Sequence, residues 1–175
     1  MDLLRRLRPV GAHAAAALAV GMASGCADRG AAAPEPVQLD ITVSADARVN
    51  LDAQGRAAPL QLRIYELKTP VAFEAADYFG LANGDRALLQ TDLVSRQEWL
   101  LRPGESQRLR RAAQPEATAI GVLAGYRDLP AVRWRAVHPL PGAAQSSWTR
   151  WLTPARKVRL HVLADETGVQ VKAAD

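Results

Sequence analysis

The sequence predicts an all-β domain: an antiparallel β-sandwich of about eight strands with one short added helix. Short segments in which apolar and polar residues alternate recur along the chain, as they do in half-buried strands. Clusters of Gly, Pro, Asn and Asp separate these segments, and such residues mark turns. Strand and helix patterns do not alternate regularly, which disfavours a parallel α/β fold.

The individual strands follow from this period of two. Val37, Leu39, Ile41 and Val43 alternate with polar residues and predict the first strand. Residues 118–126 (TAIGVLAGY) carry no charge, which predicts a central strand buried on both faces. Residues 93–101 contain the capping-box spacing of a helix start, but they run into a turn at 102–105, so we predict a strand. Further strands are predicted at 60–67, 106–110, 134–137, 158–162 and 169–171.

The one predicted helix follows the second strand. Thr69 suits its N-cap and Pro70 its first helical position, while Gly80 is suited to end it. Residues 83–85 (Asn-Gly-Asp) then predict a turn. We assign six aromatic side chains to packing in the core: Tyr65, Phe73, Tyr78, Phe79, Tyr126 and Trp134.

A long loop separates the first two predicted strands. It contains Asn50, Asp52 and Gly55, which favour turns, and Pro59 closes it. Hairpin loops usually have two to five residues, whereas this one has roughly fourteen, and loops of that length are often functional. The segment is therefore a candidate for binding.

The N-terminal residues 1–25 have the order of an export signal. Arg5, Arg6 and Arg8 precede an uncharged run at 10–22, and small residues lead into Cys26. Ser24, Gly25 and Cys26 match the lipobox of bacterial lipoproteins, although Ala23 stands where leucine is usual. The sequence therefore predicts that Cys26 is lipidated after cleavage. The alternatives are an ordinary secretory signal and a spanning helix, but the apolar run is short of the roughly twenty residues that a bilayer needs.

The residues after Cys26 predict a membrane-tied domain. Residues 26–36 form the lipidated cysteine and a small, Pro-containing tether, and 37–175 form the β-sandwich domain. Ten tether residues reach at most roughly 35 Å. Ala27, rather than Asp, follows the cysteine, which favours the outer membrane, and Asp28 weakens that inference only slightly.

Composition excludes several kinds of site. The chain has 22 basic and 18 acidic residues, and the signal removes three Arg and one Asp, so the high pI is no argument for binding nucleic acid. The only cysteine is the lipidation site, which leaves no thiol for a metal or disulfide. Outside the signal, His138 and His161 are isolated from clustered carboxylates. The sequence thus predicts no enzyme, no cofactor and no metal.

Two groups of side chains leave other functions open. Trp99, Trp134, Trp148 and Trp151 are candidates for a glycan platform, although core or edge packing is the simpler interpretation. Arg108, Arg110 and Arg111 are candidates for a basic patch, against the simpler interpretation of a solvated strand face. A periplasm-facing ligand- or glycan-binding lipoprotein is the main alternative function, and an exported enzyme or enzyme inhibitor is the third.

Six pieces of the chain, in order, resemble one known family. They are 50–56 (NLDAQGR), 59–67 (PLQLRIYEL), 73–81 (FEAADYFGL), 101–105 (LRPGE), 121–128 (GVLAGYRD) and 134–135 (WR). Together, behind a lipobox, they resemble the type VI secretion lipoprotein family (TssJ, also called VasD). The resemblance spans roughly 85 residues and is made by the combination, since no single piece is decisive.

The resemblance implies a fold, a place and a partner. The fold is a transthyretin-like β-sandwich, and the protein is an outer-membrane lipoprotein that faces the periplasm. Its loop between the first two strands docks on the periplasmic domain of the IcmF-like inner-membrane protein, within the trans-envelope membrane complex. No small-molecule substrate is expected. Carried onto this chain, the loop is 46–58, and the predicted partner-binding residues are Asn50, Leu51, Asp52, Gln54 and Arg56, with Gly55 shaping the turn.

Overall fold

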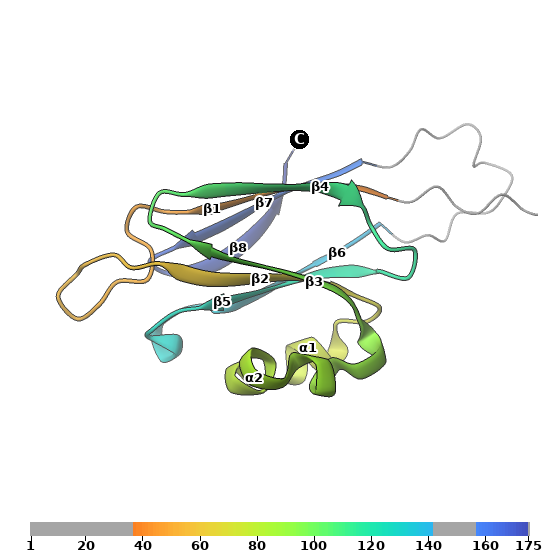
Figure 1. Ribbon diagram of the computed structural model, residues 1–175, viewed down its shortest axis with the longest axis horizontal. Coiled ribbons are helices and arrows are strands. Elements are labelled where there is room, and N and C mark those ends of the chain that lie inside the picture. Colours follow the sequence, from red (N-terminus) through yellow and green to blue (C-terminus); the bar gives the residue numbers. More distant parts are fainter. Residues whose placement is uncertain (1–36, 142–156, 175) are drawn as a thin grey trace, which may run out of the picture. The chain divides into compact units, whose positions relative to one another are not determined.

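The computed structural model describes residues 37–141 and 157–174, and these form two four-stranded sheets packed face to face (Figure 1). Sheet A has the strand order β4-β1-β7-β8 and sheet B the order β3-β2-β5-β6. The strands are β1 (Gln38–Ala45), β2 (Leu60–Leu67), β3 (Leu93–Leu101), β4 (Ser106–Ala112), β5 (Ala119–Gly125), β6 (Arg135–Pro139), β7 (Lys157–Asp165) and β8 (Gly168–Ala173). The predicted fold class, with about eight strands, is confirmed.

One strand pair departs from the antiparallel pattern. β1 pairs with β7 in parallel, with Gln38 opposite Lys157 and Ala45 opposite Ala164, while the neighbouring pairs of both sheets are antiparallel. The alternation of side chains sets which face of a strand is buried, but it does not set the direction of a distant partner. The parallel pair therefore could not be read from local sequence.

The core lies between the sheets and is lined by alternate residues of each strand. Ile41 and Val43 of β1 belong to this core together with Leu62 and Ile64 of β2, and all four are essentially inaccessible to solvent. In β5, residues 119–124 are all buried, as predicted for the central uncharged strand. The reason is that β5 has the sandwich core on one face and a helical layer on the other.

The helical segment is longer than the single short helix that we predicted. α1 (Val71–Ala75) has Pro70 at its N-cap, and α2 (Tyr78–Leu89) follows after two residues. Gly80 lies in the first turn of α2 instead of ending a helix. The Asp77 side chain caps α2 by accepting a hydrogen bond from the Gly80 amide at 2.9 Å. The predicted turn at 83–85 is also wrong: Gly84 is a kink with φ −143° inside α2.

Two 3₁₀ turns, η1 (Gln90–Asp92) and η2 (Leu129–Ala131), complete the described elements. The helices lie below sheet B in Figure 1. Phe73 of α1 is fully buried and packs on Tyr65, with ring centroids 5.3 Å apart. Gly121 of β5 lets the Phe73 ring lie close to the sheet, because a Cβ at residue 121 would be only 3.1 Å from that ring.

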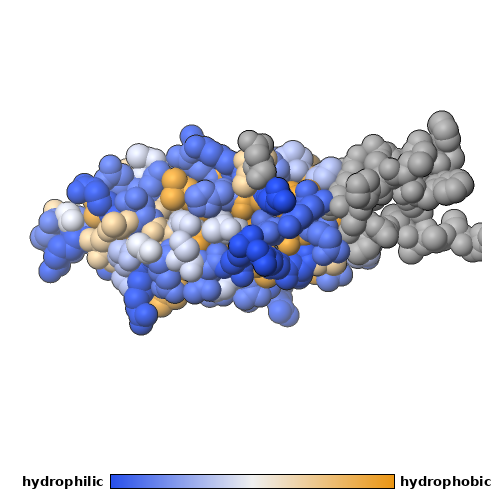
Figure 2. All heavy atoms as spheres, turned by 90° about the horizontal axis from the view of Figure 1, so that it is seen from above, coloured by the Kyte–Doolittle hydropathy of each residue, from blue (hydrophilic) through white to orange (hydrophobic). Residues whose placement is uncertain are grey.

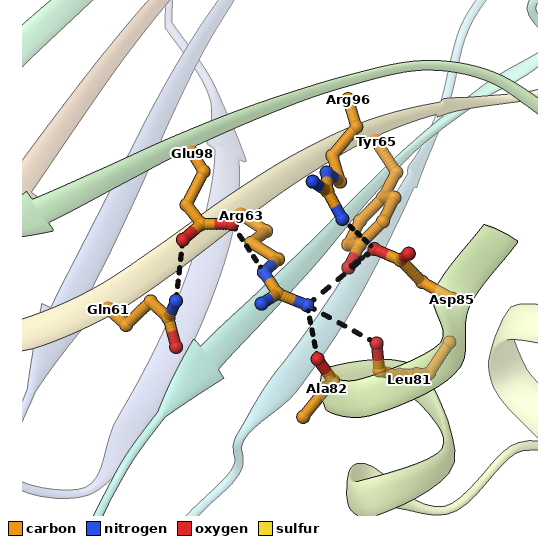
Figure 3. Close-up of polar contacts among 8 residues, drawn as sticks. All are labelled: Gln61, Arg63, Tyr65, Leu81, Ala82, Asp85, Arg96 and Glu98. Carbon is orange, nitrogen blue, oxygen red and sulfur yellow. Dashed lines mark hydrogen bonds and ion pairs between the residues drawn. The ribbon is translucent and has the colours of Figure 1, made fainter.

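A polar cluster fastens α2 to sheet B (Figure 3). Asp85 of α2 accepts hydrogen bonds from the Tyr65 hydroxyl at 3.0 Å and from Arg96 at 2.7 Å. Arg63 donates to the main-chain carbonyls of Leu81 and Ala82 at 3.3 and 2.8 Å. Burial opposes ionisation of Asp85, but the hydrogen bonds from Arg96 and Tyr65 outweigh it and lower its pKa.

Five of the six aromatic assignments hold. Tyr65, Phe73 and Tyr126 are buried, and Tyr78 and Trp134 are partly buried and pack edge to face. The assignment of Phe79 to the core is wrong, because its side chain is 64% exposed. Since α2 starts at Tyr78 and not before, Phe79 is rotated away from the face that Phe73 shares with the sheet.

Candidate functional site

The loop between β1 and β2, residues 46–59, projects beyond the end of the sandwich (Figure 1). Its base is held inside the domain. Val49 is fully buried in the core between the sheets, and Asn50 is 5% exposed. The Asn50 amide donates to the Pro59 carbonyl at 2.9 Å, and its oxygen accepts from the Arg127 main chain at 2.9 Å. Asn50 also has φ 54°, a left-handed conformation that Asn tolerates better than most residues.

Asp52 organises the tip of the loop. One carboxylate oxygen accepts from the amides of Gln54 and Arg56, each at 2.9 Å, and the other accepts from the Arg56 guanidinium at 2.8 Å. Gly55 has φ 74° and donates its amide to the Asp52 carbonyl. The amide hydrogen bond from Arg56 is the main reason that the pKa of Asp52 is lowered. The tip is thus a closed turn that presents the exposed side chains of Gln54 and Arg56.

A groove of about 510 Å³ runs beside this loop. Three segments meet there: the β1–β2 loop, the segment after β5, and the β7–β8 turn at Glu166. Gly168 (φ 133°) lets the last two approach, because a Cβ there would lie 2.4 Å from the Arg133 carbonyl oxygen. The residues lining the groove are Asn50, Leu51, Asp52, Ala53, Tyr126, Arg127, Asp128, Ala131, Val132 and Glu166.

The groove carries charge of both signs. Arg127 lies 4.0 Å from Asp52, and Arg48 and Glu166 form an exposed ion pair at 3.0 Å that links the β1–β2 loop to the β7–β8 turn. Such exposed pairs contribute little to stability, but they leave polar groups along the groove for a partner.

The structure brings the six predicted partner-binding residues together at one end of the sandwich. Gln54, Gly55 and Arg56 are exposed, Leu51 and Asp52 are half-buried, and Asn50 is buried. Sequence reasoning missed the groove residues from outside the loop, Tyr126, Arg127 and Glu166, because no local pattern reports that the three segments meet. Whether these residues bind a partner stays a prediction.

The tryptophans and histidines singled out from the sequence give little support for a second binding site. Trp99 and Trp134 pack against the core, and His161 lies 3.2 Å from the Ser44 hydroxyl. Trp148, Trp151 and Cys26 lie outside the described residues. Within 37–141 and 157–174, no group of three or more His, Cys, Asp or Glu residues could hold a metal ion. In that same part of the chain, no helix is both long and apolar enough to cross a membrane.

Comparison with known proteins decides the family. Residues 37–166 match the family model described as type VI secretion lipoprotein, VasD, EvfM, TssJ, VC_A0113. The chain belongs to this type VI secretion lipoprotein family. No curated protein sequence matches it.

Solved structures of TssJ-type lipoproteins share the fold. The T6SS lipoprotein TssJ1 from Pseudomonas aeruginosa is 36% identical, with a TM-score of 0.71 over 80% of this chain and 98% of that one. Serratia marcescens Lip, a membrane-bound component of the type VI secretion system, is 27% identical, with a TM-score of 0.71 over 78% and 98%. A chain in a structure described as the T6SS protein TssM C-terminal domain (869–1107) from EAEC is 24% identical, with a TM-score of 0.58 over 77% and 99%.

Family membership fixes the class of protein. The family consists of lipoproteins of a secretion system, so the protein is membrane-anchored, and the family is not one of enzymes.

Proposed function

We propose that this lipoprotein anchors the type VI secretion membrane complex to the outer membrane by docking the periplasmic domain of the IcmF-like (TssM) component. The observation that carries the proposal is the prestructured β1–β2 loop in a chain of this family. The likeness to a chain in a structure described as a TssM domain supports the choice of partner. The export signal, the lipobox ending at Cys26 and the residue Ala27 support the outer-membrane location.

The geometry of the loop suits docking. Binding loses affinity when a flexible loop must be ordered at the interface. Here Asp52 already fixes the turn through three hydrogen bonds, and Asn50 ties the base of the loop to the segment after β5. Of the six residues proposed to bind the partner, we expect Leu51, Asp52, Gln54 and Arg56 to touch it. Asn50 and Gly55 contribute by holding the loop in its shape.

The test is a loop variant that leaves the core intact. Deleting 47–58 would remove Val49 and Ala58 from the core, so Gln54→Ala combined with Arg56→Ala is the cleaner change. Both side chains are exposed at the tip. We expect the variant to bind the purified periplasmic domain of the IcmF-like protein at least roughly tenfold more weakly than wild type does. Arg86→Ala, an exposed change on α2, is the matched control. Binding of the loop variant at the wild-type level would reject this docking surface.

The lipid anchor has its own test. Cys26→Ser removes the thiol that would carry the lipid, and we expect the protein to leave the outer-membrane fraction. An unchanged membrane fraction would refute anchoring at this residue. Mass spectrometry of the mature N-terminus then identifies the cleavage site, which matters because Ala23 departs from the usual lipobox.

A further inference from the structure

The outer face of sheet A gathers basic side chains from three of its four strands. Leu39, Ile41 and Leu160 point into the core, so the residues that alternate with them point outward. The register then sets Arg110, Asp40 and Arg159 in one row across the sheet, and Arg108, Thr42, His161 and Lys172 in the next. The cations of this face are Arg108, Arg110, Lys157, Arg159 and Lys172, all exposed.

Among the residues that the structure describes, one carboxylate lies between these five cations, and the cations already bind it. Asp40 accepts two hydrogen bonds from Arg108 at 2.7 and 2.8 Å and one from Arg110 at 3.4 Å, and Lys157 lies 3.6 Å away. The Asp40 side chain is 4% exposed, so its charge is covered by the guanidinium groups. Within the described part of the chain, this face therefore presents an excess of positive charge to solvent.

A shallow hollow of about 280 Å³ lies in the middle of this face. Two guanidinium groups, an imidazole and a hydroxyl border it, and these are donors that suit a phosphate group. Figure 2 is seen from the side of sheet A and shows a mostly hydrophilic surface there. The lining residues are Asp40, Thr42, Arg108, Arg159, Leu160, His161 and Ala174.

We propose that the outer face of sheet A binds the phosphate headgroups of anionic phospholipids in the membrane that holds the lipoprotein. The protein belongs to a family of lipoproteins, and the predicted tether of ten residues keeps the domain within roughly 35 Å of the bilayer. A polybasic surface is the usual second anchoring signal beside a lipid chain. The loop at the end of the sandwich stays available for the partner, since it does not belong to this face.

Membrane binding can be separated from the lipid by testing the domain alone. Every described strand pairs within 37–174, and the TssJ1 chain, 98% covered by this one, was solved as a domain of this extent. The chain from Ala27 onward is mixed with phosphatidylcholine vesicles that contain or lack one part in four of phosphatidylglycerol, and sedimented. We compare wild type, Arg159→Glu with Lys172→Glu, and Lys68→Glu with Arg86→Glu. The last variant makes the same change of net charge at exposed positions outside this face.

We expect wild type and the Lys68/Arg86 variant to bind only the anionic vesicles, and to release at about 0.5 M salt, where charges are screened within a few ångströms. The Arg159/Lys172 variant should bind at least about tenfold more weakly. Equal binding by both variants, or binding to neutral vesicles, would overturn the proposal. Displacement by inorganic phosphate at constant ionic strength would instead assign the face to free phosphate.

The same variants distinguish this proposal from the docking function. The Arg159/Lys172 variant should capture the IcmF-like domain as well as wild type does. If it captures that domain poorly while its vesicle binding is unchanged, the basic face is a protein contact and the membrane assignment is wrong. If the Gln54/Arg56 variant still captures the IcmF-like domain, the docking proposal fails and the vesicle result is unaffected. The two proposals therefore fail separately.

Discussion

Asp40 on the outer face of sheet A and Asp85 of α2, which packs on the outer face of sheet B, are both nearly inaccessible to solvent: Asp40 is 4% exposed and Asp85 5%. Both are surrounded by arginines. On sheet B, Arg63 and Arg96 converge on Asp85, and Arg63 also binds main-chain carbonyls of α2. Its donors are therefore used to fix a helix.

On sheet A, the arginines around Asp40 remain 52% and 64% exposed in their side chains, and three more cations share the surface. The same residue types thus have different consequences on the two faces. Where a helix covers the sheet, the ionic contacts are largely buried and join the helix to the sheet. On sheet A the exposed cations outnumber the carboxylate that they cover, and the excess is available for binding.

The largest test of this difference removes an anchor of the helical layer. Phe73→Ala deletes a fully buried ring between α1 and sheet B, and we expect the free energy of unfolding to fall by about 3–5 kcal/mol. Phe79→Ala, on the same helical segment but 64% exposed, should change it by less than about 0.5 kcal/mol. Urea unfolding measures both. Similar losses in the two variants would contradict the placement of these rings.

A second test removes the carboxylate beneath α2. Asp85→Ala leaves Arg96 and the Tyr65 hydroxyl without their shared acceptor, while Arg63 keeps its ion pair with Glu98 at 2.8 Å. We expect a loss of about 3 kcal/mol, because each buried donor that loses its acceptor costs about 1–3 kcal/mol. Asp85→Asn keeps an oxygen acceptor and should lose less. A loss below about 1 kcal/mol in Asp85→Ala would show that α2 does not depend on the cluster.

A third, smaller effect concerns the space beneath α1. In Gly121→Ala, the new methyl group would lie 3.0 Å from a Leu67 methyl and 3.1 Å from the Phe73 ring. Overpacking of this kind costs about 1–3 kcal/mol. Gly84→Ala, at the kink of α2 where a Cβ meets nothing within 4 Å, is the control for the added methyl group. Thermal unfolding of both variants compares the two positions.

The smallest expected effect lies on sheet A and depends on pH. The hydrogen bond from Arg108 is the main cause that holds the pKa of Asp40 well below its ordinary range, against the effect of desolvation. A lowered pKa stabilises the folded state above the ordinary aspartate pKa of about 3.9, and this stabilisation is lost as the pH falls below it. Asp40→Asn should therefore flatten the loss of stability in acid, as measured by urea unfolding between about pH 6 and pH 2. Parallel acid profiles of wild type and variant would contradict this.

Much of the fold could be predicted from sequence because the residue pattern of a strand is local to that strand. The alternation in 37–44 and the uncharged run in 118–126 led to β1 and β5 nearly to the residue. The helical layer was underestimated because Gly80 and Gly84 normally end or weaken helices. Here packing on sheet B overrides that preference: Leu81 and Leu89 are buried beneath α2, and Asp77 supplies the cap.

The candidate site could likewise be predicted only where its signals are local in the sequence. The β1–β2 loop could be located from its length and its turn residues, since both are local. The groove beside it, the basic face of sheet A and the buried position of Asn50 depend on contacts between segments up to 118 residues apart, such as that between Arg48 and Glu166. Arg108 and Arg110 did stand out in the sequence, but only the pairing with β1 and β7 shows that Asp40 and Arg159 share their surface.

The position of β1 has a mechanical consequence. It follows the predicted tether directly and leads into the β1–β2 loop, so it joins the proposed membrane end of the protein to the proposed partner end. β1 is also an inner strand, hydrogen-bonded to β4 on one side and to β7 on the other over its whole length. A pull between lipid and partner would act along this strand and be carried by its covalent backbone, while the ladders to β4 and β7 hold the strand extended in the sheet.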